Sequence, residues 1–116
     1  MNEILLCSHN PILIKSLYGL LRDDGYEVDI ADHPALAVQR VLSKDFEALV
    51  IDSEPFGLSA DEAIQIVRSV LPDLPVISVG PSKSDSSALS MKIPVDLEEF
   101  KQIISDVHCY NTIHHK

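Results

Sequence analysis

The stretch Ala48-Leu49-Val50-Ile51-Asp52 decides the fold, because four consecutive apolar residues end in a carboxylate. An apolar run without alternation is typical of a strand that is covered on both faces, as in a parallel sheet flanked by helices. We therefore expect this stretch at the centre of an α/β sheet, with Asp52 where the strand ends.

Similar short apolar runs lie on both sides of that stretch. They cover Ile4–Cys7, Val76–Val79 and, more weakly, Leu89–Ile93, whereas Glu27–Ala31 alternates as a half-buried edge strand would, with Val28 and Ile30 inward. Segments with apolar residues at helical spacing separate most of these runs, and such alternation predicts a parallel sheet with helices on both faces. Four helix starts are predicted from N-cap residues and capping boxes, at Asn10-Pro11, Asp32, Ser59–Glu62 and Asp96–Glu99.

The alternation breaks between Val79 and Leu89, where the segment 80–88 is short and rich in serine. It is too polar for the expected helix, and we predict a loop with at most one helical turn. Loss of a helix uncovers apolar surface, and uncovered apolar surface marks interaction sites. Val79, Leu89 and Met91 are therefore predicted to line an interaction face. Residues 1–108 are expected to form one domain and 109–116 a frayed tail.

Composition narrows the classes of partner. The chain has 116 residues, 46% of them hydrophobic, which suits a single domain with a buried core. A net charge of −9, with nine scattered Lys and Arg, argues against nucleic acid and membrane surfaces as partners.

Cys7 and Cys109 are expected to be free thiols. The sequence contains neither a signal peptide nor a long apolar run, so we expect a cytoplasmic protein.

Three polar residues follow or end the predicted central strands: Ser8, His9 and Asp52. A hydrolase triad is disfavoured, because Ser8 and His9 are neighbours on an extended chain and point in opposite directions. His9, Asp52 and Glu54 could hold a transition metal, since imidazole suits such ions. A solvated loop remains the favoured interpretation, and no metal site is predicted.

Five fragments occur in the order, and at nearly the spacings, of a known family: Ile4–Cys7, Leu20–Asp32, Ala48–Asp52, Leu74–Val79 and Pro94–Phe100. On these fragments the chain resembles the CheY-like receiver domain of bacterial response regulators. The resemblance implies a flavodoxin-like, doubly wound five-stranded parallel sheet of order 2-1-3-4-5. Here its fourth helix would be shortened or replaced by a loop.

The resemblance also implies where the functional positions lie. Asp52 occupies the position of the phosphoacceptor aspartate. The acidic pair that binds Mg²⁺ is replaced by Ser8 and His9, although hard cations need oxygen ligands and usually carboxylates. Gly80 stands at the position of the hydroxyl residue, and Ile93 at that of the phosphate-pairing lysine. We therefore expect a degenerate pseudo-receiver.

The expected function is that of a stand-alone receiver-like domain in a two-component phosphorelay, acting through protein–protein interaction without phosphorylation. It would be neither an enzyme nor a cofactor-binding protein. Its partner would be a histidine kinase, a downstream signalling protein, or a second copy in a homodimer. Two alternatives stay open: an active response regulator phosphorylated on Asp52 with Mg²⁺, and a small metal-binding flavodoxin-like protein.

Overall fold

The computed structural model describes residues 3–52, 58–79, 89–91 and 97–114, and only the backbone at 58, 89–91 and 110–114. In chain order the elements are β1 (Glu3–Cys7), α1 (Pro11–Asp23), β2 (Glu27–Ala31), α2 (Pro34–Ser43), β3 (Ala48–Asp52), α3 (Leu58–Val70), β4 (Val76–Val79), β5 (Leu89–Met91) and α4 (Leu97–His114). All neighbouring strands are parallel, in the order β2-β1-β3-β4-β5. The predicted five-stranded sheet and its strand order are confirmed.

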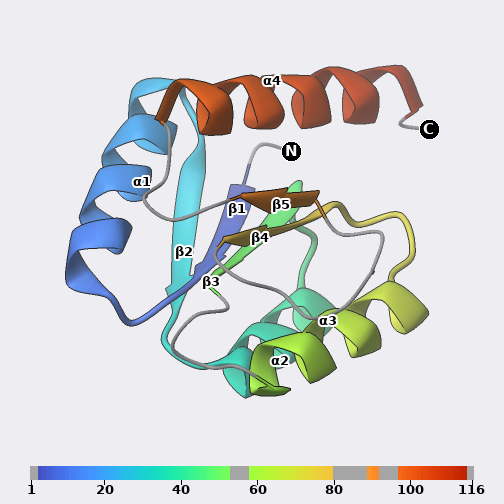
Figure 1. The fold of residues 1–116 in the computed structure, drawn as a ribbon. Helices are drawn as coiled ribbons and strands as arrows, with labels where there is room; N and C mark the ends of the chain where they lie inside the picture. The colour runs from blue at the N-terminus through green and yellow to red at the C-terminus, as the bar shows by residue number, and fades with distance from the viewer. Residues whose placement is uncertain (1–2, 53–57, 80–88, 92–96, 115–116) are drawn as a thin grey trace.

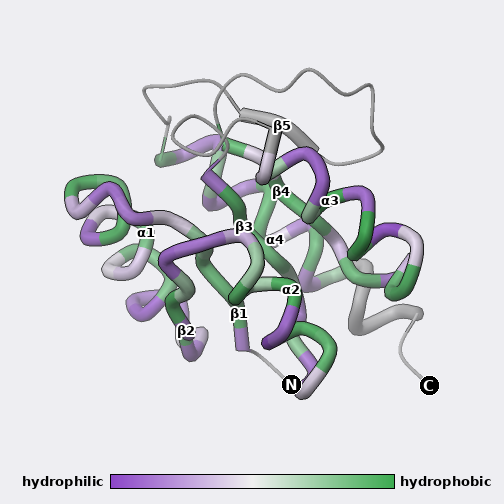
Figure 2. Tube along the Cα trace, turned by 90° about the horizontal axis from the view of Figure 1, so that it is seen from below, coloured by the Kyte–Doolittle hydropathy of each residue, from purple (hydrophilic) through white to green (hydrophobic). Residues whose placement is uncertain are grey.

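Helices cover both faces of the sheet. Helices α1 and α4 lie on one face, and α2 and α3 lie on the other (Figure 1). Successive residues of β3 supply the two cores in turn, since Val50 faces the α1–α4 layer and Ile51 the α2–α3 layer. Hydrophobic colouring accordingly runs along the inner strands in Figure 2. The unbroken apolar run of β3 follows from this coverage on both faces.

Two helix starts differ from the prediction. Helix α2 is capped by the His33 side chain, which accepts a hydrogen bond from the Ala35 N–H, rather than by Asp32. Pro34 explains the difference, because a residue before proline is held in extended backbone, the conformation an N-cap needs. Helix α3 begins at Leu58, so Ser59 lies inside it and is not its cap. The predicted cap Asp96 lies outside the described residues.

The start and end of α1 agree with the sequence pattern. Asn10 accepts hydrogen bonds from the N–H groups of Ile12 and Leu13, and Pro11 occupies the first helical position. At the other end Gly25 has a φ of 92°, a left-handed conformation that glycine adopts without the penalty a Cβ imposes. This turn sends the chain back along the sheet edge as β2.

The last helix is longer than predicted. It continues to His114, so residues 109–114 are helical and the expected tail does not begin at residue 109. No glycine or proline occurs between Val107 and His114, so nothing in the sequence breaks the helix there. The predicted loop at 80–88 and the terminal residues 115–116 lie outside the described residues.

Candidate functional site

Parallel strands end at a common edge, and this edge brings the predicted site residues together. Cys7 at the end of β1 pairs with Ala31 of β2 and with Ile51 of β3. The next residues along β1 and β3 are Ser8 and Asp52, which therefore emerge side by side. Carboxyl-terminal edges of this kind are where ligands bind in open α/β sheets.

Ser8 and Asp52 form a buried pair. The Ser8 Oγ donates a hydrogen bond of 2.9 Å to Oδ2 of Asp52. The relative exposure of Ser8 is 0% and that of Asp52 is 2%. Ser8 is held from two further directions, because its N–H donates to the Ala31 carbonyl at 3.0 Å and its Oγ accepts from the Asn10 N–H at 3.1 Å. A neutral hydroxyl thus occupies the side of Asp52 where the resemblance implies a metal-binding carboxylate.

The other predicted site residues do not all join this pair. His9 is exposed whereas Ser8 is buried, as expected for neighbours on an extended chain. Ser8 donates directly to a carboxylate, which differs from a triad, where an imidazole stands between the two groups. Glu54, Gly80 and Ile93 lie outside the described residues. Within the part of the chain that is described, no group of three or more His, Cys, Asp or Glu could hold a metal ion.

The electrostatics of this edge are negative. Burial first, and then the carboxylates of Asp52 and Asp32, raise the pKa of the Cys7 thiol to about 12. Asp32 follows β2, and the sequence pattern predicts for it only the role of a helix cap. Its signal was its place after a strand end, since parallel strands carry such residues to the same edge. Cys7 is therefore a protonated, buried thiol rather than a reactive one.

The predicted interaction face is wrong at Val79. This residue is 0% exposed and belongs to the core cluster that includes Phe100 and Ile104 of α4. Along β4 the side chains alternate between the two layers, so Val79 points toward α4 and is covered by it. The side chains of Leu89 and Met91 lie outside the described residues.

An apolar groove lies instead between α1 and β2. Its volume is about 670 Å³, and it is lined by Pro11, Ile14, Lys15, Tyr18, Gly19 and Ile30. Ile12, in the first turn of the same helix, is 79% exposed. A Cβ added at Gly19 would meet no atom within 4 Å, so the helix surface is open there. The sequence signal for this groove was a helix with apolar residues on more than one face.

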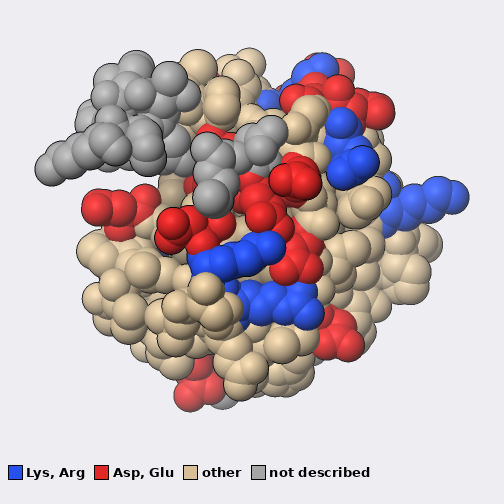
Figure 3. Space-filling view, turned by 180° about the vertical axis from the view of Figure 1, so that it is seen from behind, with Lys and Arg blue, Asp and Glu red and all other residues tan. Residues whose placement is uncertain are grey.

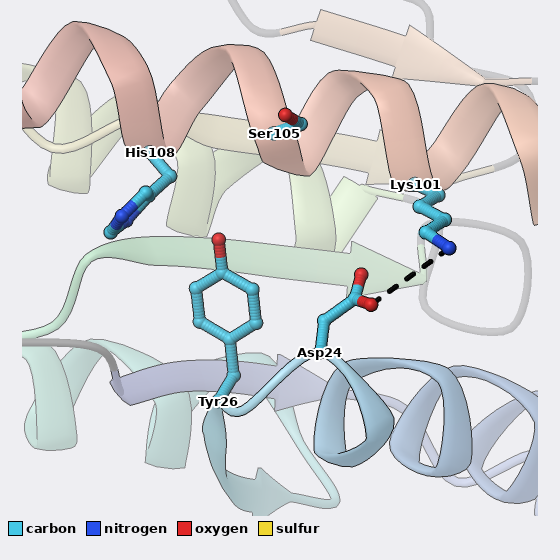
Figure 4. A pocket seen from close by; sticks show the side chains of 5 residues that line it. All are labelled: Asp24, Tyr26, Lys101, Ser105 and His108. Atoms are coloured by element: carbon cyan, nitrogen blue, oxygen red, sulfur yellow. Dashed lines mark ion pairs between the residues drawn. The ribbon is translucent and has the colours of Figure 1, made fainter.

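A second hollow, of about 290 Å³, lies between the turn that precedes β2 and helix α4, and is lined by Asp24, Tyr26, Lys101, Ser105 and His108. Figure 4 shows Tyr26, the residue before β2, pointing toward α4. Its ring meets the His108 ring edge to face, with the two ring centroids 5.9 Å apart. Nδ1 of His108 lies 2.6 Å from Oε1 of the buried Glu47. Asp24 and Lys101 form a looser ion pair of 3.9 Å at the other side of the hollow. No sequence argument pointed to this cluster.

Surface charge is mixed on the face drawn in Figure 3. Acidic side chains form a band across it, and the basic side chains lie beside them rather than in a patch of their own. Arg40 pairs with Asp29, and Lys44 pairs with Glu3 at 2.7 Å. Among the described helices, none combines the length and apolar character that a membrane span requires.

Comparison with known proteins gives one consistent answer at the level of structure. No family model and no curated protein matches the sequence. The chain is similar to the response regulator TrrA of Thermotoga maritima in complex with Mg²⁺–BeF, at 24% identity and a TM-score of 0.81, covering 92% of this chain and 99% of that one.

Two further solved structures agree. One is the receiver domain of a Pseudomonas aeruginosa sensor histidine kinase with a magnesium ion in its active-site cleft, at 20% identity, TM-score 0.78, and 90% and 95% coverage. The other is a Saccharomyces cerevisiae receiver domain crystallised with its histidine phosphotransfer signalling protein, at 18% identity, TM-score 0.80, and 93% and 89% coverage. The chain has the fold of response-regulator receiver domains.

Proposed function

We propose that this chain is a receiver-like interaction module of two-component signalling that works without phosphorylation of Asp52. The observation that supports it is the buried hydrogen bond from Ser8 to Asp52. A hydroxyl donor stabilises the buried carboxylate without adding a formal charge to the site. Asp52 then has a hydrogen-bond donor within the protein and does not depend on a bound cation for one.

The donor set fits Mg²⁺ poorly. Magnesium prefers near-octahedral oxygen ligands and is usually bound through one or two carboxylates. Among the described residues at this edge, Asp52 and Asp32 supply carboxylates, Ser8 a hydroxyl that already donates to Asp52, and His9 an exposed imidazole. No group of three or more His, Cys, Asp or Glu in the described chain could hold a metal ion. Phosphoryl transfer depends on cations that neutralise the charge of the transferred group. The described residues of this edge therefore do not support phosphoryl transfer to Asp52 through Mg²⁺.

Phosphorylation can be tested directly. The protein is incubated with acetyl phosphate and millimolar Mg²⁺, and its intact mass is recorded. We expect no phosphorylated species, and Asp52→Asn is the matched control. A phosphorylated species in the natural chain that is missing from the variant would overturn the proposal. That result would favour the alternative of an active receiver, which the place of Asp52 at the end of β3 supports.

Rebuilding the acidic pocket gives a second test. In Ser8→Asp/His9→Asp a second carboxylate stands beside the buried Asp52, so like-charge repulsion should lower the melting temperature in chelator. Millimolar Mg²⁺ should restore it, because a ligand that binds only the folded state stabilises that state. The exposed His9→Asp alone is the control. A rise of the natural chain's melting temperature with Mg²⁺ would contradict the poor fit.

The proposed docking surface is the α1–β2 groove, defined above by its six lining residues, and the proposed occupant is an amphipathic helix of a protein partner. An apolar concave surface next to the exposed Ile12 is suited to such a helix. Lys15 is the charged residue of the lining in a strongly acidic chain, so a carboxylate on the partner helix would complement it. A neighbour in fold that was crystallised with a phosphotransfer protein supports this class of partner.

Gly19 offers a sharp test of the groove. Gly19→Leu should fill the groove without a clash inside the domain, because a Cβ there meets open space. Gly19→Ala is the matched control, and alanine favours the helix over glycine by about 1 kcal/mol. Calorimetry with a purified histidine phosphotransfer domain from the same organism should show binding by the natural chain and Gly19→Ala, and loss by Gly19→Leu. Unchanged binding by Gly19→Leu, or no binding by the natural chain, would contradict this docking mode.

A further inference from the structure

Ser8 takes part in a continuous hydrogen-bond path from Asp52 to the first turn of α1. Its Oγ donates to Asp52 and accepts from the Asn10 N–H. The Asn10 side chain in turn accepts from the N–H groups of Ile12 and Leu13, which caps the helix. Pro11, the residue after this cap, lines the groove. The path thus joins the buried carboxylate to one end of the α1–β2 groove.

We infer that Ser8 transmits the charge and hydrogen-bonding state of Asp52 to the N-terminus of α1 and so to the groove beside it. Ser8 acts here as a positioning residue. A hydroxyl that donates to a carboxylate has its proton fixed, and its lone pairs are then presented to the Asn10 N–H. Any event that neutralises or occupies Asp52 weakens this charge-assisted bond and frees the hydroxyl to rotate.

The surroundings of Ser8 favour transmission rather than local relaxation. The side chain is fully buried, and its backbone N–H is fixed to the Ala31 carbonyl. A closely packed site passes a displacement on to its neighbours, because it has no free volume to absorb it. On the β1 side the chain is held in the sheet, so a displacement of the Ser8 hydroxyl is passed to the Asn10 cap. This inference rests on the proposed function only where the groove is treated as the docking surface.

The coupling can be measured on the isolated protein, without a phosphoryl donor or a partner. Backbone amide shifts and hydrogen exchange are compared for the natural chain, Asp52→Asn, Ser8→Ala and the double variant. Asp52→Asn should shift the amides of Asn10, Ile12 and Leu13, and raise exchange of the last two about two- to fivefold, up to the effect of losing an N-cap. In the Ser8→Ala background the same substitution should leave these amides within error of Ser8→Ala alone.

Controls separate the path from general loosening. Ser78→Ala removes another buried serine hydroxyl, on β4, for which no hydrogen-bond partner is found within the described chain. Asp52→Asn should keep its full effect on α1 in that background. If Ser8→Ala does not fold, Ser8→Cys keeps the size of the side chain with a weaker donor, and the coupling should fall. Equal effects of Asp52→Asn with and without the hydroxyl, or no effect on α1 in the natural chain, would overturn the inference.

These readouts stay distinct from those of the proposed function. A phosphorylated Asp52 in the mass measurement would remove the proposed function and leave the coupling intact. Absence of the coupling would leave the phosphorylation result untouched.

Discussion

Strand β3 has a buried carboxylate at each end, and the two are held in opposite ways. Asp52 ends the strand and accepts from Ser8, the residue that follows the neighbouring strand β1. Glu47 directly precedes the strand and meets His108, which comes from the last helix. The first partner is a short, neutral and fully buried side chain. The second is a longer and titratable side chain that is 51% exposed, while the Glu47 side chain is 4% exposed.

The two contacts stabilise different parts of the fold. Ser8 belongs to the same sheet edge as Asp52, so their bond fixes the geometry of the edge where a receiver fold carries its site. His108 joins two elements that are far apart in sequence, so its contact with Glu47 fastens α4 against the rim of the sheet. At the Asp52 end of β3 the bond fixes a sheet edge, and at the Glu47 end the contact fixes a helix.

The largest loss of stability is expected at the Asp52 end of β3. Ser8→Ala leaves the buried Asp52 carboxylate without this donor and should cost about 1–3 kcal/mol of unfolding free energy. Urea denaturation measures it, with Ser78→Ala as the control because both variants remove a buried hydroxyl. Ser78→Ala should be close to neutral. Equal losses in the two variants would mean that the bond to Asp52 adds nothing.

A smaller loss of stability is expected at the Glu47 end of β3. His108→Ala should cost about 0.5–1 kcal/mol, because the His108 side chain is half-exposed and water can replace the imidazole beside Glu47. Gln102→Ala, which removes an exposed bond to Asp106 on the same helix, is the control and should change less. A loss above that of Ser8→Ala would reverse the comparison between the two ends.

The pKa of Tyr26 reports on the Glu47 end of β3, and ionisation of this ring does not alter the stability at neutral pH. Burial first, and then the nearby Glu47, Asp24 and Cys109, raise its pKa to about 12. Because the folded pKa is raised, the stabilisation is complete below the unfolded value near 10 and is lost as pH rises toward 12. Absorbance titration should show Tyr26 ionising late, and earlier in Glu47→Gln. An unchanged midpoint would show that Glu47 does not act on this ring.

The smallest effect is expected on the reactivity of Cys7, whose pKa reports on the Asp52 end of β3. Its pKa of about 12 results first from burial, and only then from Asp52 and Asp32. Asp52→Asn should therefore lower it in part and leave the thiol unreactive. At pH 8 a thiol reagent should label the exposed Cys109 quickly and Cys7 only on unfolding. Fast labelling of Cys7 in Asp52→Asn would show that the carboxylate, not burial, protects it.

The sequence predicted the sheet well because its signals are local. The apolar run of β3 and the Asn10-Pro11 pair each carry their own physical reason, and neither depends on distant residues. The cap at His33 was missed because Pro34 restricts the residue before it, a constraint stronger than the preference of Asp32 for caps. The prediction of an exposed Val79 is wrong because α4 covers it, whatever follows β4 in the sequence.

The candidate site was predictable only in part. Strand ends placed Ser8 and Asp52 at one edge, but the substitution was interpreted as a lost charge rather than as a new donor. The direct bond depends on the register between β1 and β3, which the sequence does not display. The Glu47–His108 contact and the α1–β2 groove depend on how helices pack on the sheet. Neither has a signal in a single sequence beyond a glutamate beside an apolar run and apolar residues around a helix.

The two contacts of β3 also differ in when they can form during synthesis. Ser8 and Asp52 are 44 residues apart, and Glu47 and His108 are 61 apart. A nascent chain that has emerged as far as β3 already holds both partners of the first contact, whereas the second must await the last helix. Non-local contacts form slowly because a long loop must close first. The contact at Asp52 can therefore form before α4 has been synthesised, and α4 then covers the core that Val50, Ile77 and Val79 present on its side of the sheet.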